Sequence, residues 1–307
     1  MVKMYFPVAG IELNPLVPVL IGLGASLVSS PTGISGGFLI LPVSVNFLHF
    51  SGLAVSPTNY LFNIISMPPG LWRLSREKRL LRGLGGLITL GSLPGIFLGT
   101  ALRCTWLKRA ADFKVFVALV LAFLALSLLR GLGQKNSKAA RAESEFIKRR
   151  GCQADLAASY GLLSVNFCFG GENFSVSTPR LLLLSLAIGL VGGIYGIGGA
   201  AIIAPLLVGL LQVPVYVAGG ASLLAGWAGA VAGLFSYIVF WPWVSGQAPV
   251  WPDFRLGFLF GLGGMAGVYC GSTLARFLPP RPLKLLMLLL IVFLLIQNLG
   301  FLDRLAQ

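Results

Sequence analysis

The sequence GISGGFLILP at residues 33–42 occurs again, in altered form, as GIGGAAIIAP at residues 196–205. At the same offset, Thr58-Asn59 aligns with Ala221-Ser222. After a small insertion, a further set of small residues aligns, namely Gly91, Gly95, Gly99 and Thr100 with Gly263, Gly267, Gly271 and Ser272. Chance similarity between apolar segments would not keep Gly and Pro in register, so the chain is predicted to consist of two homologous repeats.

Around these motifs the chain is strongly apolar, with 56% hydrophobic and only 10% charged residues among its 307. A water-soluble globule of this length needs more polar surface. Ten apolar segments, five on each side of a polar middle, lie near residues 15–30, 37–50, 54–72, 83–102, 113–130, 181–194, 200–213, 215–241, 255–275 and 283–301. Crossing a bilayer takes about 17–25 such residues, so the sequence predicts an all-α polytopic protein of the cell membrane.

The polar middle divides the chain into three parts. We expect a first transmembrane repeat at 1–130, a polar cytoplasmic linker at 131–179 and a second transmembrane repeat at 180–307. Within the linker, LLSVNFCF and ENFSVS alternate apolar with polar residues on either side of Gly170-Gly171. This pattern favours a small β-hairpin outside the membrane, with an irregular loop as the alternative.

The basic residues predict the orientation of the two repeats. Loop 73–82, the linker and the region around Arg276 are rich in Lys and Arg, which is typical of cytoplasmic loops. Placing all three on that side inverts the repeats, with either five crossings per repeat or a re-entrant pair plus three. Arg103, Lys108, Arg109 and Lys114 would then lie outside, against the rule.

Several function classes are disfavoured. The basic residues stand beside apolar segments and form no nucleic-acid module. No Asp, Glu, Lys or Arg occurs in 13–72 or in 181–252, so coupling through an intramembrane carboxylate is not expected. The single His49 is interpreted as an interfacial or packing residue, and the four Cys lack a metal or disulfide spacing. No metal or cofactor is expected, and an intramembrane enzyme is disfavoured because no catalytic set is present.

The repeated Gly motifs are the candidate binding site. Glycines that interrupt an apolar run can open a new helix whose free amide groups and dipole attract an anion. The residues concerned are Gly33, Ser35, Gly36 and Gly37 in the first repeat and Gly196, Gly198 and Gly199 in the second. The alternative is that these glycines only permit close helix packing. Pro42 and Pro205 follow as hinges or as static kinks.

The next polar candidates are Thr58, Asn59 and Asn63, with Ser222 in the second repeat. A buried amide without a partner costs about 2–7 kcal/mol. Asn59 is therefore expected to bond to another helix or to the substrate.

The paired motifs GISGGFLILP and GIYGIGGAAIIAP resemble those of the TauE/SafE family of sulfite exporters, and the likeness covers nearly the whole chain. The resemblance implies transport of sulfite, thiosulfate, sulfonates or other small anions, by alternating access around the site residues named above. Ser35, Ala200 and Ala201 depart from a full Gly triplet in the two copies. The alternatives are a proton-coupled uptake permease for an organic or sulfonate acid, and a membrane scaffold. The expected partners are a small anionic substrate and the lipid bilayer.

Overall fold

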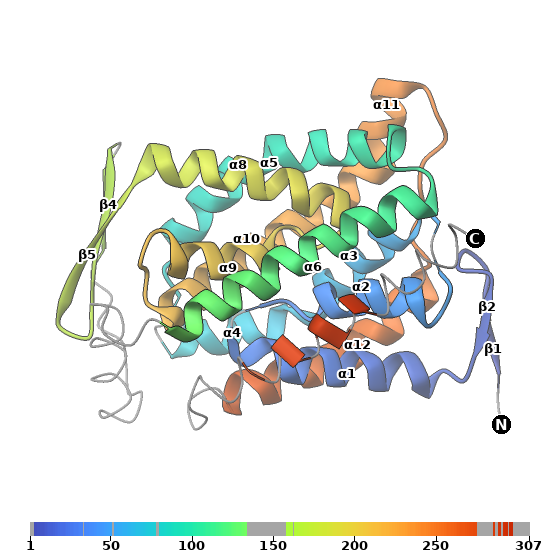
Figure 1. Ribbon diagram of the computed structural model, residues 1–307, viewed down its shortest axis with the longest axis horizontal. Helices are drawn as coiled ribbons and strands as arrows, with labels where there is room; N and C mark the ends of the chain where they lie inside the picture. Colours follow the sequence, from blue (N-terminus) through green and yellow to red (C-terminus); the bar gives the residue numbers. More distant parts are fainter. Residues whose placement is uncertain are drawn as a thin grey trace.

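The computed structural model is an elongated bundle of helices with a small β-sheet at either end (Figure 1). It describes residues 3–32, 34–50, 52–77, 80–133, 158–161 and 163–274, together with a few residues between 285 and 296. The predicted segment 283–301 therefore lies largely outside the described residues. So does most of the linker, residues 134–157.

Each remaining apolar segment forms helix, which confirms the predicted class. The first half contains α1 (Leu16–Ser29), the 3-10 turn η1 (Ser30–Thr32), α2 (Gly37–Asn46), α3 (Val55–Ser66), α4 (Pro68–Arg76), α5 (Arg82–Thr105) and α6 (Ala110–Gly133). The second contains α8 (Thr178–Tyr195), α9 (Ala200–Gly209), α10 (Val215–Phe235), the π-helix η2 (Ser236–Phe240), α11 (Trp241–Ser245) and α12 (Phe254–Leu274). Among the described residues, Arg82–Thr105, Thr178–Tyr195, Val215–Ser245 and Phe254–Leu274 are long and apolar enough to cross a membrane. The chain is a multi-pass membrane protein.

Both Gly motifs break a helix. α1 ends before the first motif and α2 starts at Gly37, while α8 ends at Tyr195 and α9 starts at Ala200. The 14 residues of α1 extend about 21 Å at 1.5 Å each, less than a hydrocarbon core of about 30 Å. In Figure 1, α2 and α9 each turn back beside the helix that precedes them. Whether these short helices re-enter or cross the membrane stays a prediction.

Helices in corresponding positions of the two halves pack in corresponding ways. α12 packs on α1 and α3, and α5 packs on α8 and α10. Along the first contact, Val19, Leu23 and Leu27 meet Gly263, Gly267 and Gly271 in ascending order, so α1 and α12 run parallel. α5 and α8 also run parallel, because Gly91, Gly95 and Gly99 meet residues from Leu182 to Ile194 in the same order. In Figure 1 the two groups run in opposite directions, while the inversion relative to a membrane stays a prediction.

The β-hairpin in the linker is confirmed. β4 (Ser164–Phe169) pairs antiparallel with β5 (Glu172–Ser177), and β3 (Ala158–Tyr160) pairs with β4. Gly170 and Gly171 both have positive φ, as a tight two-residue turn requires. This sheet lies at the end of the bundle where α8 begins (Figure 1).

A second hairpin at the N-terminus was not predicted. β1 (Met4–Phe6) pairs with β2 (Ile11–Leu13), at the opposite end of the bundle from β4 and β5 (Figure 1). Its turn is held by the buried carboxylate of Asp253, which accepts hydrogen bonds from the amides of Val8 and Ala9, each at 3.1 Å. Strands of three residues carry too little pattern to predict, and Asp253 is 245 residues away from Val8 in sequence.

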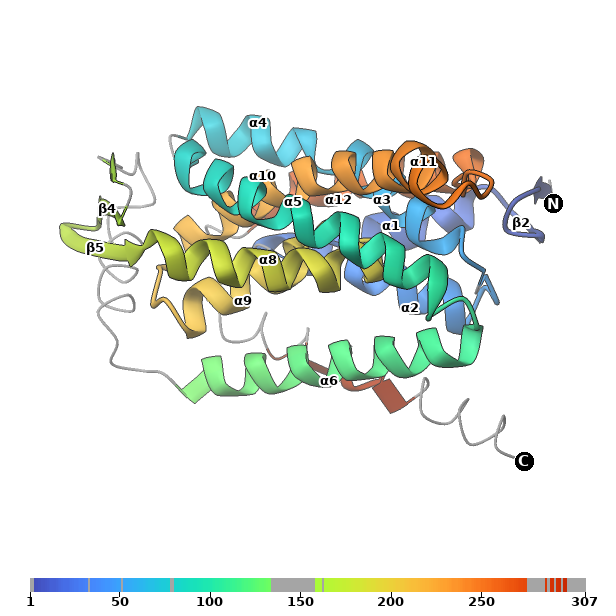
Figure 2. The same ribbon diagram turned by 90° about the horizontal axis from the view of Figure 1, so that it is seen from above.

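Two sequence expectations need correction. Segment 54–72 is two helices, because Pro68 and Pro69 follow Met67 and start α4. The expected basic loop 73–82 is in part helical, since α4 continues to Arg76. Arg103, whose predicted position on the outer side of the membrane stays a prediction, is fully buried in α5, where it donates to the carbonyls of Leu107 and Gly52 and its Cζ lies 3.7 Å from the centre of the Phe113 ring. Lys114 is also buried, in α6. Viewed from above, α6 runs along one side of the bundle, where it packs on α9 (Figure 2).

Candidate functional site

The helix break between α1 and α2 is the first break, and that between α8 and α9 is the second. The two breaks meet beside the N-terminal half of α3. The Tyr195 hydroxyl, at the end of α8, donates to the carbonyl of Phe38 in the first turn of α2, at 3.0 Å. The Ser56 hydroxyl of α3 donates to the carbonyl of Ile194 at 3.2 Å. A side chain on Gly196 would also lie against the Ser56 backbone. The fold therefore brings the repeated motifs into contact across the interface between the halves.

The first break holds a buried polar cluster. The Gly37 amide donates to Ser35 Oγ at 3.1 Å, and the Ser35 hydroxyl donates to Asn63 Oδ1. Asn59 Nδ2 donates to the Gly37 carbonyl at 2.9 Å. Asn59 and Asn63 are 2% and 0% exposed, and they lie one turn apart on α3, facing the start of α2. The sequence prediction that Asn59 needs a partner is thus met partly by the neighbouring helix.

Three polar atoms in this cluster have no hydrogen-bond partner: Ser26 Oγ, Asn59 Oδ1 and Asn63 Nδ2. They face the two glycines at the helix start. A methyl group built on Gly37 would lie 2.7 Å from Asn63 Nδ2 and 3.1 Å from Asn59 Oδ1, and one on Gly36 would lie 2.7 Å from Ser26 Oγ. Buried polar groups are normally bonded, and each exception calls for an explanation such as a ligand or an ordered water.

The second break is built differently. Gly196, Gly198 and Gly199 all have positive φ, at 85°, 60° and 83°, which side chains other than glycine rarely adopt. A side chain on Gly198 would meet the backbone of α10 near Gly226, and one on Gly199 would meet Ile188 of α8. Glycine is required here by backbone conformation and close packing. Of the two sequence interpretations, close packing fits the second break.

The free groups also differ from those expected. The sequence predicts a cradle of backbone amides at both breaks, but the Gly37 amide is capped by Ser35. The unpaired atoms at the first break are side-chain atoms instead. At the first break, the Gly37 amide is therefore not one of the free groups.

The other predicted residues lie apart from the polar cluster. Thr58 accepts a hydrogen bond from the Asp253 amide at 2.8 Å, and it donates to the carbonyl of Ala54 within its own helix. Ser222 is buried and donates to the carbonyl of Ala218 one turn earlier in α10. Gly33 lies outside the described residues. The structure thus groups Ser35, Gly36, Gly37, Asn59 and Asn63, and separates them from Thr58 and Ser222.

Pro42 has a visible effect on hydrogen bonding. A residue with an amide hydrogen at this position of α2 would donate to the carbonyl four residues earlier, which is that of Phe38. Because proline has no amide hydrogen, that carbonyl accepts the hydrogen bond from Tyr195 of the other half. Pro205 occupies the same place in α9. Whether either proline acts as a hinge stays a prediction.

Four residues of the site were missed in the sequence. Ser26, in α1, gave no signal because its neighbours are apolar. Tyr60, Tyr195 and Tyr237 are fully buried, and their hydroxyls donate to the carbonyls of Gly192, Phe38 and Gly193. A tyrosine inside an apolar segment is a weak signal by itself, although a buried hydroxyl normally finds an acceptor. These bonds tie α3, α8 and η2 to the backbone around the two breaks.

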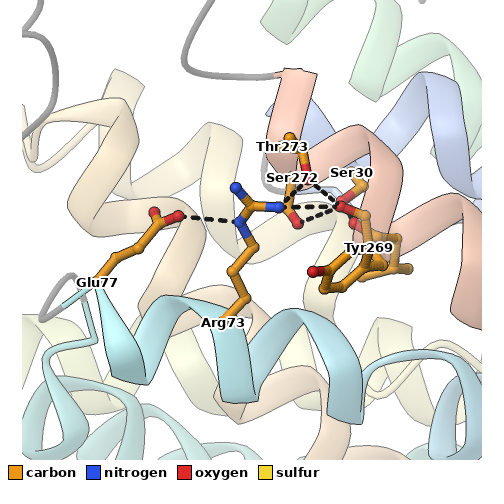
Figure 3. A network of polar contacts seen from close by, with 7 residues as sticks. Ser30, Arg73, Glu77, Tyr269, Ser272 and Thr273 are labelled. Atoms are coloured by element: carbon orange, nitrogen blue, oxygen red, sulfur yellow. Dashed lines mark hydrogen bonds and ion pairs between the residues drawn. The ribbon is translucent and has the colours of Figure 1, made fainter.

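A second polar network lies where α1 ends, between α4 and the end of α12. Arg73 of α4 forms an ion pair with Glu77 at 2.9 Å and donates to Thr273 in the last turn of α12 (Figure 3). A cation here stabilises the negative end of the α12 dipole. Ser30, just after α1, donates to the carbonyl of Val268 at 3.2 Å. The network holds α1, α4 and α12 together outside the polar cluster.

The described residues contain no group of His, Cys, Asp and Glu that could hold a metal ion. The site is a buried, uncharged polar cluster at a helix break, between two halves of a multi-pass membrane protein. Broken helices that meet near the middle of a membrane bundle are the typical binding sites of secondary transporters. Fold and site together define a membrane transporter.

The chain belongs to the family described as Sulfite exporter TauE/SafE, whose sequence profile matches residues 18–298. It is also 24% identical over 254 residues to the probable membrane transporter protein YunE of Bacillus subtilis (strain 168). That alignment covers 79% of this chain and 86% of YunE. No solved structure matches the chain.

Proposed function

We propose that this transporter exports small oxyanions, with sulfite or a closely related sulfur oxyanion as the substrate. The observation that carries the proposal is the set of unpaired polar atoms at the first break, Ser26 Oγ, Asn59 Oδ1 and Asn63 Nδ2. Neutral donors can bind an anion of modest charge and still release it, whereas a buried arginine or lysine would hold it more tightly.

Transport is proposed to proceed by alternating access around this cluster. The cluster is buried and its side chains close on one another, so the described conformation supports an occluded state. Admitting a solute requires α2 to separate from α3. The hydrogen bonds from Tyr195 to Phe38 and from Tyr60 to Gly192 join the halves across this region, and they would break and re-form in each cycle.

The membrane potential is the proposed driving force. An inside-negative potential favours exit of a monovalent anion by about 2.3 kcal/mol per 100 mV. Export then needs no coupling carboxylate, in keeping with the absence of Asp and Glu from residues 13–72 and 181–252. Uptake of a protonated acid, the alternative, would instead respond to a pH gradient at zero potential.

The test is efflux of labelled sulfite from proteoliposomes with an imposed potential. We expect the rate to rise as the sulfite-containing side becomes more negative. Asn63→Asp replaces the free amide donor by a carboxylate of the same size and a negative charge. We expect this change to lower the rate by roughly 10- to 100-fold, because a hydrogen bond to a charged group contributes about 1.5–3 kcal/mol.

Asn166→Asp, the same exchange on the exposed side of β4, is the matched control and should leave efflux unchanged. Efflux that ignores the potential would count against electrogenic export. Full activity of Asn63→Asp would show that the first break is not the binding site.

A further inference from the structure

The hydrogen bonds of the first break fix which of its atoms donate and which accept. The Gly37 amide donates to Ser35 Oγ, and the Ser35 hydroxyl donates to Asn63 Oδ1. The unpaired Nδ2 of Asn63 then faces the site as a donor. Asn59 must donate from Nδ2 to the Gly37 carbonyl, because a carbonyl can only accept. Its free Oδ1 therefore faces the site as an acceptor.

A ligand that satisfies both asparagines needs an acceptor and a donor. A fully deprotonated oxyanion offers acceptors alone, and it would set a negative oxygen against Asn59 Oδ1. An oxyanion that retains one proton can accept from Asn63 and donate to Asn59. Ser26 Oγ, a hydroxyl that can do either, accommodates the third oxygen.

Resting on the proposed function, we infer that the site selects a singly protonated oxyanion, such as hydrogen sulfite, over the sulfite dianion and over monoanions that carry no proton. The proton travels with the solute as its own hydroxyl group, and no side chain of the protein has to take it up.

The helices that surround the cluster place no titratable group in it, so we expect any pH dependence of transport to come from protonation of the solute. α1, α2, α3 and α10 contain no Asp, Glu, Lys, Arg or His. Tyr60 and Tyr195 face the region, but both hydroxyls are occupied as donors to backbone carbonyls. The charged residue of α8, Arg180, lies in its first turn, about 18 Å along the helix from Gly192.

The charged groups near the two ends of α12 also form their interactions outside the cluster. At its start, Arg255 donates to the Tyr5 carbonyl at 3.5 Å. Asp253, which precedes the helix, accepts from the amides of Val8, Ala9 and Leu256. At its far end, Arg73 pairs with Glu77 outside the cluster. His49 lies in the loop after α2.

The experiment measures anion efflux from proteoliposomes at a fixed potential, with equal pH on both sides. Total sulfite is held constant while the pH is varied across the interconversion of hydrogen sulfite and sulfite. We expect the rate to follow the hydrogen sulfite fraction and to fall as the pH rises. Methanesulfinate, a monoanion of similar size with a methyl group in place of the hydroxyl, should be carried at least about tenfold more slowly, because it leaves the Asn59 acceptor unpaired.

Asn59→Ser provides the matched variant, because Ser222 occupies the aligned position in α10 and bonds within its own helix. The substituted serine can bond to the carbonyl of Val55 in the same way and withdraw from the site. We expect the rate ratio of hydrogen sulfite to methanesulfinate to fall toward one. A retained ratio, or a rate in the native protein that follows the sulfite dianion, would overturn the inference.

The inference and the proposed function fail in distinguishable ways. If the native protein carries no oxyanion at any pH, the proposed function is wrong. If it carries methanesulfinate and sulfite equally well and independently of pH, only the selection for a protonated anion is wrong. Should Asn59→Ser not fold, the pH series and the anion ratio of the native protein decide the question.

Discussion

At the residue scale, glycine serves two distinct purposes in the repeated motifs. In the second break, Gly196, Gly198 and Gly199 supply positive φ values. In the first, Gly36 has φ of −59°, within the ordinary helical region, and glycine is instead required for space. The space beside Gly36 and Gly37 is bounded by the unpaired polar atoms of α1 and α3.

This difference predicts the effect of adding one methyl group. Gly37→Ala would place its methyl group 2.7 Å from Asn63 Nδ2, which forces the asparagine away and fills the polar cluster. Alanine favours a helix by up to about 1 kcal/mol, so the protein should still fold. We expect anion efflux in proteoliposomes to fall by at least about tenfold, which corresponds to the loss of roughly 1.4 kcal/mol.

The control is the opposite exchange at the aligned position, Ala200→Gly, at the first residue of α9. It should retain most of the efflux. Equal rates for Gly37→Ala and the native protein, at equal amounts of reconstituted protein, would contradict a binding role for this space.

At the element scale, small residues determine which helices can pair. The aligned triplets Gly91, Gly95, Gly99 and Gly263, Gly267, Gly271 each lie against the first helix of the opposite half. Without a hydrophobic driving force inside lipid, helices associate through close backbone packing, which small residues allow. The triplets are therefore the contacts that join the halves, and their repetition in the sequence reflects packing.

Two glycines two residues apart in α1 test this interpretation. A methyl group on Gly22 would collide with the carbonyl of Phe260 in α12, whereas one on Gly24 would meet nothing within 4 Å. We expect Gly22→Ala to destabilise the protein by about 1–3 kcal/mol through overpacking. Gly24→Ala should be neutral or stabilising by up to about 1 kcal/mol. Thermal unfolding in detergent measures both, and equal shifts in Tm would refute the packing argument.

At the scale of the whole molecule, the helices form two groups that run in opposite directions. One contains α1, α3 and α12 and the other contains α5, α8 and α10. The groups touch through α3 and α10, where Trp227 donates to the carbonyl of Ile64. The polar cluster lies in the first group, close to this boundary, so a relative movement of the groups would change access to it.

The arrangement predicts which ends of the bundle face opposite sides of the membrane. β4 and β5 lie at one end, and the loop after α11 lies at the other (Figure 1). In a protein whose other cysteines are replaced by alanine, Cys168 of β4 should react with a membrane-impermeant maleimide only from the cytoplasmic side. Gln247→Cys, exposed in the loop after α11, should react only from outside. Labelling of both from one side would contradict the orientation predicted from the basic loops.

The sequence by itself determined the membrane class, the helical segments and the alignment of the motifs, and it indicated the linker hairpin, which the structure decided against an irregular loop. These are local or composition-dependent properties: apolar length sets a helix in lipid, and Gly170-Gly171 sets a tight turn. Only the tertiary structure decided that Asn59 and Asn63 face Gly37 while Thr58 bonds to Asp253, and that Arg103 is buried against Phe113. Those outcomes depend on which residues distant in sequence meet across helix interfaces, and identical glycines at the two breaks acquire different roles because their neighbours differ.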